Sequence, residues 1–173
     1  MNLRLLRVRP HVLVGFATAF VLLVIALPAG AAGGSSVVIS QVYGGAGCTT
    51  AGCSTYANDY IELFNPTAAD VPLDGWSVQY AAATGTTWQT TALSGTLPAG
   101  KYYLVQEATT SANGVNPLPA PDKTGTINMS ATGAKVALSN SATALSGNCP
   151  TSGAAVVDFV GYGTTPDLSL IHI

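Results

Sequence analysis

The stretch DYIELFNP, residues 59–66, alternates between apolar and mixed side chains and then stops abruptly. Ile61 and Leu63 fall on one face of an extended chain, because successive side chains of a β-strand point to opposite sides. The tyrosine, glutamate and phenylalanine around them fall on the other face. Asn65-Pro66 ends the pattern, since proline cannot donate a hydrogen bond to a neighbouring strand. This stretch predicts a half-buried β-strand.

The same period of two recurs along the chain in short runs separated by Gly, Pro, Asn and Asp, and no stretch sustains a helical repeat. Seven strands are expected: Val37–Tyr43, Asp59–Asn65, Trp76–Tyr80, Thr86–Leu93, Lys101–Gln106, Lys135–Ser139 and Ala154–Tyr162. The first is apolar enough for burial on both faces, and residues 108–121 are expected as a long irregular loop. Half-buried strands need a second sheet to cover them, so the sequence predicts an all-β sandwich.

The N-terminus carries the pattern of a secretory signal peptide, residues 1–31. Three arginines precede the apolar run Val12–Leu27, and the small residues Ala29–Ala31 follow it, as signal peptidase requires. The run is close to the ~20 apolar residues of a spanning helix, so an uncleaved membrane anchor is the alternative. We expect residues 32–167 to form one exported domain, secreted into the medium or held at the cell surface.

The charge of the chain is divided unevenly. Cleavage after Ala31 would leave three lysines, no arginine and eight carboxylates, a net charge of −5. Such a domain cannot neutralise a row of phosphates, which excludes nucleic-acid binding by this domain alone. Both histidines, His11 and His172, lie outside the predicted domain. Histidine-based acid/base catalysis and histidine-ligated metals are therefore excluded from it.

Five motifs cover nearly all of the predicted exported domain: Val38–Tyr43, Asp59–Thr67, Val71–Val78, Gly100–Val105 and Val157–Gly163. Their order resembles that of the lamin tail domain family, in particular its bacterial, exported branch. The combination of IELFNPT with LDGW is the most specific of them, because the strand, the proline stop and the glycine turn must all fall in register. An Asx-rich strand that normally closes such a domain is not visible.

The resemblance implies an immunoglobulin-like β-sandwich, in agreement with the strand pattern. It also implies a non-catalytic module, of the kind found ahead of extracellular nuclease or phosphatase domains on longer bacterial chains. No cofactor is expected. We expect the chain to be truncated, because the apolar tail 168–173 has no turn behind it. The parent protein would then be longer, and a secreted nuclease or phosphatase is the alternative function of the whole.

The three cysteines fit an oxidising compartment. Cys48 and Cys53 lie in one Gly/Thr-rich loop, close enough to form a disulfide if the loop turns back. So short a loop gains only ~2 kcal/mol from a disulfide, whose role would be to shape the loop. Cys149 is then unpaired, and pairing of Cys48 with Cys149 is the competing connectivity. A zinc site is disfavoured, because structural zinc usually takes four ligands.

Four carboxylates are candidates for calcium binding or acid/base chemistry: Asp59, Glu62, Asp74 and Asp158. No loop has the acidic spacing that gathers oxygens around one calcium ion. Asp74 precedes a glycine, as in a turn, and Glu62 points outward beside two core residues. The sequence therefore predicts neither a metal site nor a catalytic residue.

Aromatic residues remain as candidates for binding. Trp76, Tyr80, Trp88, Tyr102 and Tyr103 either fill the core of the sandwich or present rings to a sugar or peptide. Trp76 alternates with core residues, whereas Trp88 has polar neighbours, so Trp88, Tyr102 and Tyr103 are the candidate binding aromatics. The favoured function is an exported module that binds a protein or an extracellular polymer, and carbohydrate or cell-wall binding is a further alternative.

Overall fold

The computed structural model describes residues 34–47, 50, 52–109, 116–150 and 155–163. The predicted signal peptide 1–31, Cys48 and the predicted tail 168–173 lie outside the described residues. Within the described part there are ten strands and no helix, so no helix long and apolar enough to cross a membrane is found there. The all-β prediction is confirmed.

Each of the seven stretches predicted as strands overlaps one. They are β1 (Val38–Tyr43), β2 (Tyr60–Phe64), β4 (Ser77–Ala82), β5 (Gln89–Ala92), β7 (Tyr102–Gln106), β9 (Gly133–Ser139) and β10 (Val156–Gly163), and β4, β9 and β10 extend beyond the predicted bounds. Three strands of two residues were not predicted: β3 (Val71–Pro72), β6 (Thr96–Leu97) and β8 (Lys123–Thr124). Two residues are too few to show an alternation, so composition cannot reveal them.

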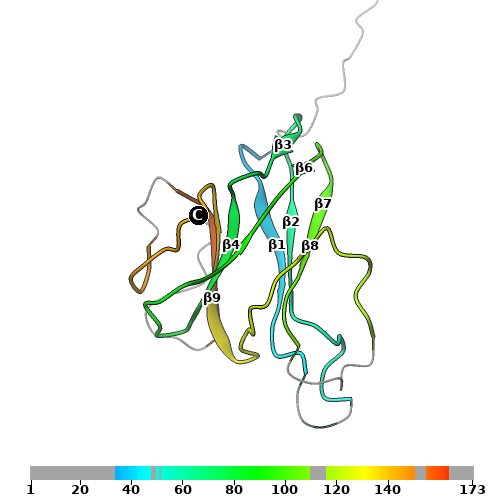
Figure 1. Cartoon of the computed structure of the whole chain (residues 1–173), viewed down its shortest axis with the longest axis vertical. Coiled ribbons are helices and arrows are strands. Elements are labelled where there is room, and N and C mark those ends of the chain that lie inside the picture. The colour runs from blue at the N-terminus through cyan, green and yellow to red at the C-terminus, as the bar shows by residue number, and fades with distance from the viewer. Residues whose placement is uncertain (1–33, 48–49, 51, 110–115, 151–154, 164–173) are drawn as a thin grey trace, which may run out of the picture. The chain divides into compact units, whose positions relative to one another are not determined.

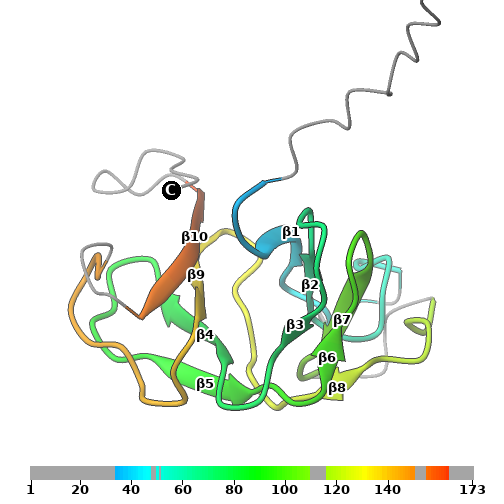
Figure 2. The same cartoon turned by 90° about the horizontal axis from the view of Figure 1, so that it is seen from above.

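Two four-stranded sheets build the sandwich (Figure 1). The first has the order β1-β2-β7-β8 and the second the order β10-β9-β4-β5, with β3 and β6 forming a small third sheet. Figure 2 shows the two large sheets as separate layers, with the edge strands β1 and β10 at the same end. Ile39 and Asp158 link these two edges, since the Ile39 N–H donates to Asp158 Oδ2 at 2.7 Å.

The core lies between the two large sheets and is built from the inward-facing side chains of their longer strands. Ile61 and Leu63 are fully buried in it, as their alternation predicted, and Val78 and Val136 of the second sheet lie in the same cluster. Burial of one such side chain contributes about 1.5–3 kcal/mol. The other face of β2 is only half-buried and forms the outer surface of the first sheet.

The Asn65-Pro66 stop is built around a buried amide. Asn65 is fully buried, and its Nδ2 donates to the backbone oxygens of Ala69 and Leu97 at 2.9 and 3.0 Å. Its Oδ1 accepts from the backbone N–H and the hydroxyl of Thr67. The side chain thus satisfies backbone groups that leave the ladder where the strand ends.

The prediction that the first strand is buried on both faces is wrong. The pairing of β1 with β2 shifts register between Ile39 and Gln41, which marks a β-bulge at Ser40. Ser40 and Gln41 are both exposed, although they are consecutive. The bulge therefore places two adjacent side chains on the outer face of the first sheet, and β1 is an edge strand rather than a central one.

The outer face of the second sheet is covered by the loop that follows β9. Gln79 Nε2 donates to Thr143 O at 2.9 Å, and Gln79 Oε1 accepts from Leu145 N–H at 2.8 Å. Lys135, which is fully buried, donates from Nζ to the backbone oxygen and the Oδ1 of Asn148 at 2.7 and 2.6 Å. Polar side chains thus hold this loop down, and the first sheet keeps the more open outer face.

Candidate functional site

Three tyrosines form a cluster at one end of the outer face of the first sheet. Tyr43 and Tyr60 are cross-strand partners in β1 and β2, and their rings stack with centroids 5.4 Å apart and planes 8° apart. Tyr56 stands perpendicular to both rings at 5.4 and 5.6 Å, so it packs across the side of the stack. The Tyr43 hydroxyl accepts the backbone N–H of Thr55 at 2.9 Å, which fixes the loop carrying Tyr56.

A shallow groove of about 210 Å³ runs beside this cluster. It is called the aromatic groove below, and its lining residues are Gln41, Tyr56, Tyr60, Glu62, Leu104, Leu118 and Pro119. The first five lie on the outer face of the first sheet or in the loop before β2. Leu118 and Pro119 form the opposite wall and come from the segment that was predicted as an irregular loop.

The polar side chains of the aromatic groove are held in place by their neighbours. Tyr60 donates its hydroxyl hydrogen to Gln41 Oε1 at 3.0 Å, and Ser40 Oγ donates to Glu62 Oε1 at 2.7 Å. Gln41 and Glu62 are cross-strand partners, and the bulge places Ser40 beside them. Bulges often occur beside functional sites, because they redirect side chains.

A second aromatic pair lies at the other end of the same face. Phe64 of β2 and Tyr102 of β7 are cross-strand partners, with ring centroids 4.7 Å apart. Tyr102 is 59% exposed and is the exposed large hydrophobic side chain of the described part. Tyr60 and Phe64 are four positions apart along β2, which corresponds to about 13 Å of extended strand.

Two of the three predicted binding aromatics are interior residues. Trp88 is 4% exposed, its Nε1–H donates to Gly147 O at 3.0 Å, and its ring packs edge-to-face against Phe159. Tyr103 is 5% exposed and lies in the main core, with its hydroxyl donating to Ser94 O. Neither can stack on a ligand, so Tyr102 alone remains of the three. The polar neighbours of Trp88 misled the prediction, because a later loop covers it.

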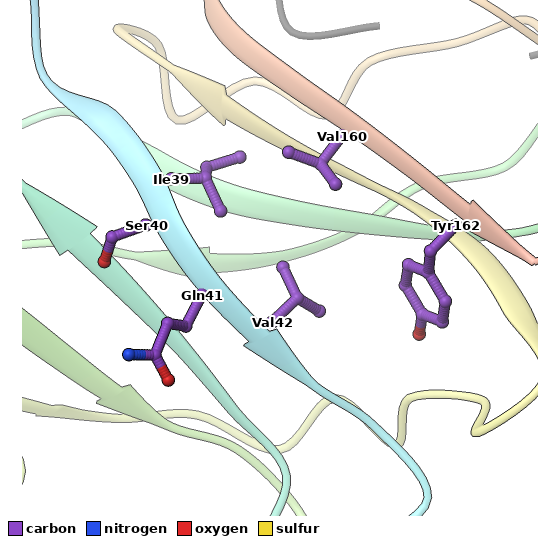
Figure 3. A pocket seen from close by; sticks show the side chains of 6 residues that line it. All are labelled: Ile39, Ser40, Gln41, Val42, Val160 and Tyr162. Carbon is purple, nitrogen blue, oxygen red and sulfur yellow. The ribbon is translucent and has the colours of Figure 1, made fainter. Parts of the chain in front are cut away.

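A second groove, of about 260 Å³, lies at the open end of the sandwich between β1 and β10. Figure 3 shows Ile39 and Val42 on the side of β1 that faces Val160 and Tyr162 of β10, while Ser40 and Gln41 point away from β10. Burial raises the pKa of the Tyr162 phenol well above its usual range, and its hydroxyl donates to Ser130 O at 2.6 Å. This groove therefore presents no acid or base that titrates near neutral pH.

The carboxylates singled out in the sequence accept hydrogen bonds within the fold. Asp59 accepts the backbone N–H groups of Ala46 and Met129 at 2.7 and 2.6 Å. Asp74 accepts that of Gly95 at 3.0 Å. In the described part of the chain, no group of three or more His, Cys, Asp or Glu side chains could hold a metal ion.

Comparison with known protein families identifies the family of this domain. A family model described as Lamin Tail Domain matches residues 30–164. The match covers well over half of the chain and includes every described strand. The chain belongs to the lamin tail domain family. A search of curated proteins gave no match.

Membership of the lamin tail domain family confirms the resemblance predicted from the five motifs. The family consists of non-catalytic, immunoglobulin-like domains, which agrees with the two-sheet architecture and with the expectation that these residues are not an enzyme. The aromatic groove of this lamin tail domain lies on the outer face of the first sheet, where Tyr56 and Tyr60 stand beside Gln41 and Glu62.

Glu107 is a buried carboxylate of this lamin tail domain that was not predicted. It is 1% exposed, its Oε2 accepts Ile127 N–H at 2.9 Å, and its Oε1 has no hydrogen-bond partner in the described part. Burial raises the pKa of Glu107, and the nearby charge of Asp59 adds to the effect. The alternation along the sequence predicts this burial, because Tyr103 and Val105 point inward and Glu107 is the next residue on the same face.

The cysteine predictions concern a loop that is only partly described. Cys48 lies outside the described residues, so its pairing with Cys53 stays a prediction. Cys149 is exposed and carries a free thiol. It follows Asn148, which Lys135 holds against the second sheet, so Cys149 lies on the opposite layer of the lamin tail domain from the aromatic groove.

Proposed function

We propose that this lamin tail domain is an exported, non-catalytic module that binds an extracellular polymer or protein through the outer face of its first sheet. One observation carries the proposal. The aromatic groove and the Phe64–Tyr102 pair occupy a sheet face that the described loops border without covering, with Leu118 and Pro119 as one wall, whereas polar tethers hold a loop across the corresponding face of the second sheet. Aromatic rings supply much of the binding energy of protein surfaces, and their clustering on one open face favours recognition there.

Secretion belongs to the same proposal and is supported by the N-terminal pattern of arginines, apolar run and small residues. The predicted exported domain is acidic and has no arginine, so nucleic acid is not among the binding partners proposed for it. Contact with a membrane would require an uncleaved signal segment.

The alternative is that these residues are the N-terminal accessory part of a secreted nuclease or phosphatase. Both oxygens of Asp59 and both oxygens of Asp158 accept hydrogen bonds from backbone N–H groups. These carboxylates therefore have structural roles, which favours a catalytic site in another domain of the parent protein. Extending the reading frame past Ile173 tests this alternative. A catalytic domain rich in Asp, Asn and His would support it, and an in-frame stop directly after this position in intact DNA would reject it.

Two measurements test the binding module itself. The purified chain should give no nuclease or phosphatase turnover, and turnover that persists through purification would reject a non-catalytic role. Binding to a panel of cell-wall preparations and extracellular proteins should weaken when Tyr102 is replaced by Glu. Replacement of Thr90, an exposed residue of β5 in the second sheet, by Glu serves as the matched control and should change nothing. Equal losses in both variants would show that the outer face of the first sheet has no special role.

A further inference from the structure

We propose that the outer face of the first sheet binds a neutral, unbranched polysaccharide, with its sugar rings stacked on tyrosine. The inference rests on the proposed function and names the chemistry of the partner. The observation behind it is an arrangement of three zones along β2: the tyrosine cluster at one end, Gln41 and Glu62 in the middle, and the Phe64–Tyr102 pair at the other end.

The two aromatic zones fit the apolar side of a sugar. A pyranose ring has a C–H face that packs on an aromatic ring and a rim of hydroxyl groups that needs hydrogen bonds. Tyr60 lines the aromatic groove, and Tyr102 is 59% exposed about 13 Å further along the sheet. Two stacking points at that separation favour an extended chain of several rings over a single sugar.

The middle zone supplies the hydrogen bonds for the hydroxyl rim. Gln41 Oε1 is engaged by Tyr60 and Glu62 Oε1 by Ser40, which orients both side chains before any ligand arrives. Gln41 Nε2 and Glu62 Oε2 have no hydrogen-bond partner in the described part. The amide NH₂ group of Gln41 and one carboxylate oxygen of Glu62 thus remain for a ligand at the groove, and their fixed positions reduce the entropy lost on binding.

The charge of the groove selects among polysaccharides. Glu62 is the one charged side chain among the residues that line the groove. The predicted exported domain has a net charge of −5 and no arginine. Uronic acid polymers, phosphate-bearing wall polymers and nucleic acids would all be repelled at this surface. A neutral chain of hydroxyl-bearing rings carries no such penalty.

The experiment is affinity electrophoresis of the purified full chain through gels containing hydroxyethylcellulose or another neutral glucan, together with pull-down on insoluble cellulose and chitin. Polygalacturonic acid and double-stranded DNA are the polyanionic probes. We expect retardation by at least one neutral polysaccharide and none by the polyanions. Tyr102→Ala should weaken retention about tenfold through loss of one stacking ring, and Glu62→Gln should weaken it by a similar factor.

The matched control is Thr90→Ala, which changes an exposed side chain of the second sheet and should bind like the wild type. Thermal unfolding of each variant separates lost binding from lost structure. Retention by polyanions alone would overturn the polysaccharide inference, and so would neutral binding that Tyr102→Ala and Glu62→Gln leave unchanged. Binding to extracellular proteins but to no polysaccharide would overturn it while keeping the proposed function. Binding to neither class would reject both.

Discussion

Replacing Trp88 distinguishes a residue of the interior from a residue of a binding surface. In the structure its indole packs against Phe159 with ring centroids 5.9 Å apart, and Lys135 Nζ lies 5.7 Å from the ring centre. Its Nε1–H donates to Gly147 O at 3.0 Å. The aromatic pair contributes about 1 kcal/mol, the cation–π contact about 1 kcal/mol and the hydrogen bond about 1 kcal/mol. Loss of the buried ring volume adds to these.

Trp88→Ala should therefore lower the free energy of unfolding by about 3–5 kcal/mol, the range of large cavity-forming substitutions. Trp88→Phe retains a ring beside Phe159 but loses the indole N–H and part of the volume, and should cost about 2 kcal/mol. Urea unfolding followed by far-UV circular dichroism measures both changes, with an unchanged denaturant slope. The melting temperature should fall by roughly 3 °C for each kcal/mol lost.

Tyr102→Ala is the matched control, because it removes an aromatic ring that is 59% exposed. Its free energy of unfolding should stay within about 0.5 kcal/mol of the wild type. If Trp88→Ala left stability unchanged and abolished ligand binding, Trp88 would be a surface residue and the packing described here would be wrong.

Three further perturbations probe buried polar groups. Burial raises the pKa of Glu107 in the folded state. The contribution of this carboxyl to the free energy of unfolding is therefore greatest at low pH and declines as the pH rises through the folded-state pKa. Urea titrations from pH 5 to 8 should show the stability of the wild type falling relative to that of Glu107→Gln as the pH increases. Lys135→Met strips the hydrogen bonds to Asn148 and should cost about 2–4 kcal/mol, with faster limited proteolysis of the loop after β9; unchanged cleavage there would contradict the tether. Asp158→Ala leaves the Ile39 N–H unpaired at the sheet edge, so light scattering should reveal concentration-dependent association absent from the wild type, and a variant that stays monomeric and equally stable would refute this edge-capping role.

The fold could be predicted because its main strands are long enough to show their period. Ile61 and Leu63 alternate with outward side chains over a full strand, and Asn65-Pro66 marks where it ends. The alternation along a strand shows which of its two faces is apolar and points to the core. Several strands with one apolar face each need a second sheet to bury those faces, so a sandwich is expected. The two-residue strands were missed because their pairing depends on neighbours distant in sequence.

The candidate site could be predicted only in part. Tyr102 was singled out, but the tyrosine cluster depends on Tyr43 meeting Tyr60 across two strands and on the loop that brings Tyr56 beside them. The aromatic groove also needs Leu118 and Pro119, which come from the segment predicted as an irregular loop. Trp88 was misjudged for the same reason, since its cover comes from residues almost sixty positions later. The composition around a residue does not show whether a segment distant in the sequence buries its side chain.

The bulge at Ser40 is an insertion that the core does not require. Ile39 and Val42 face inward on either side of it, so removing this one serine would restore simple alternation to β1 and keep the same residues inside. The Ser40–Glu62 hydrogen bond and the extra outward side chain would be lost with it. A single-codon deletion could thus separate what the outer face recognises from whether the domain folds, and related domains could gain or lose the site by that step alone.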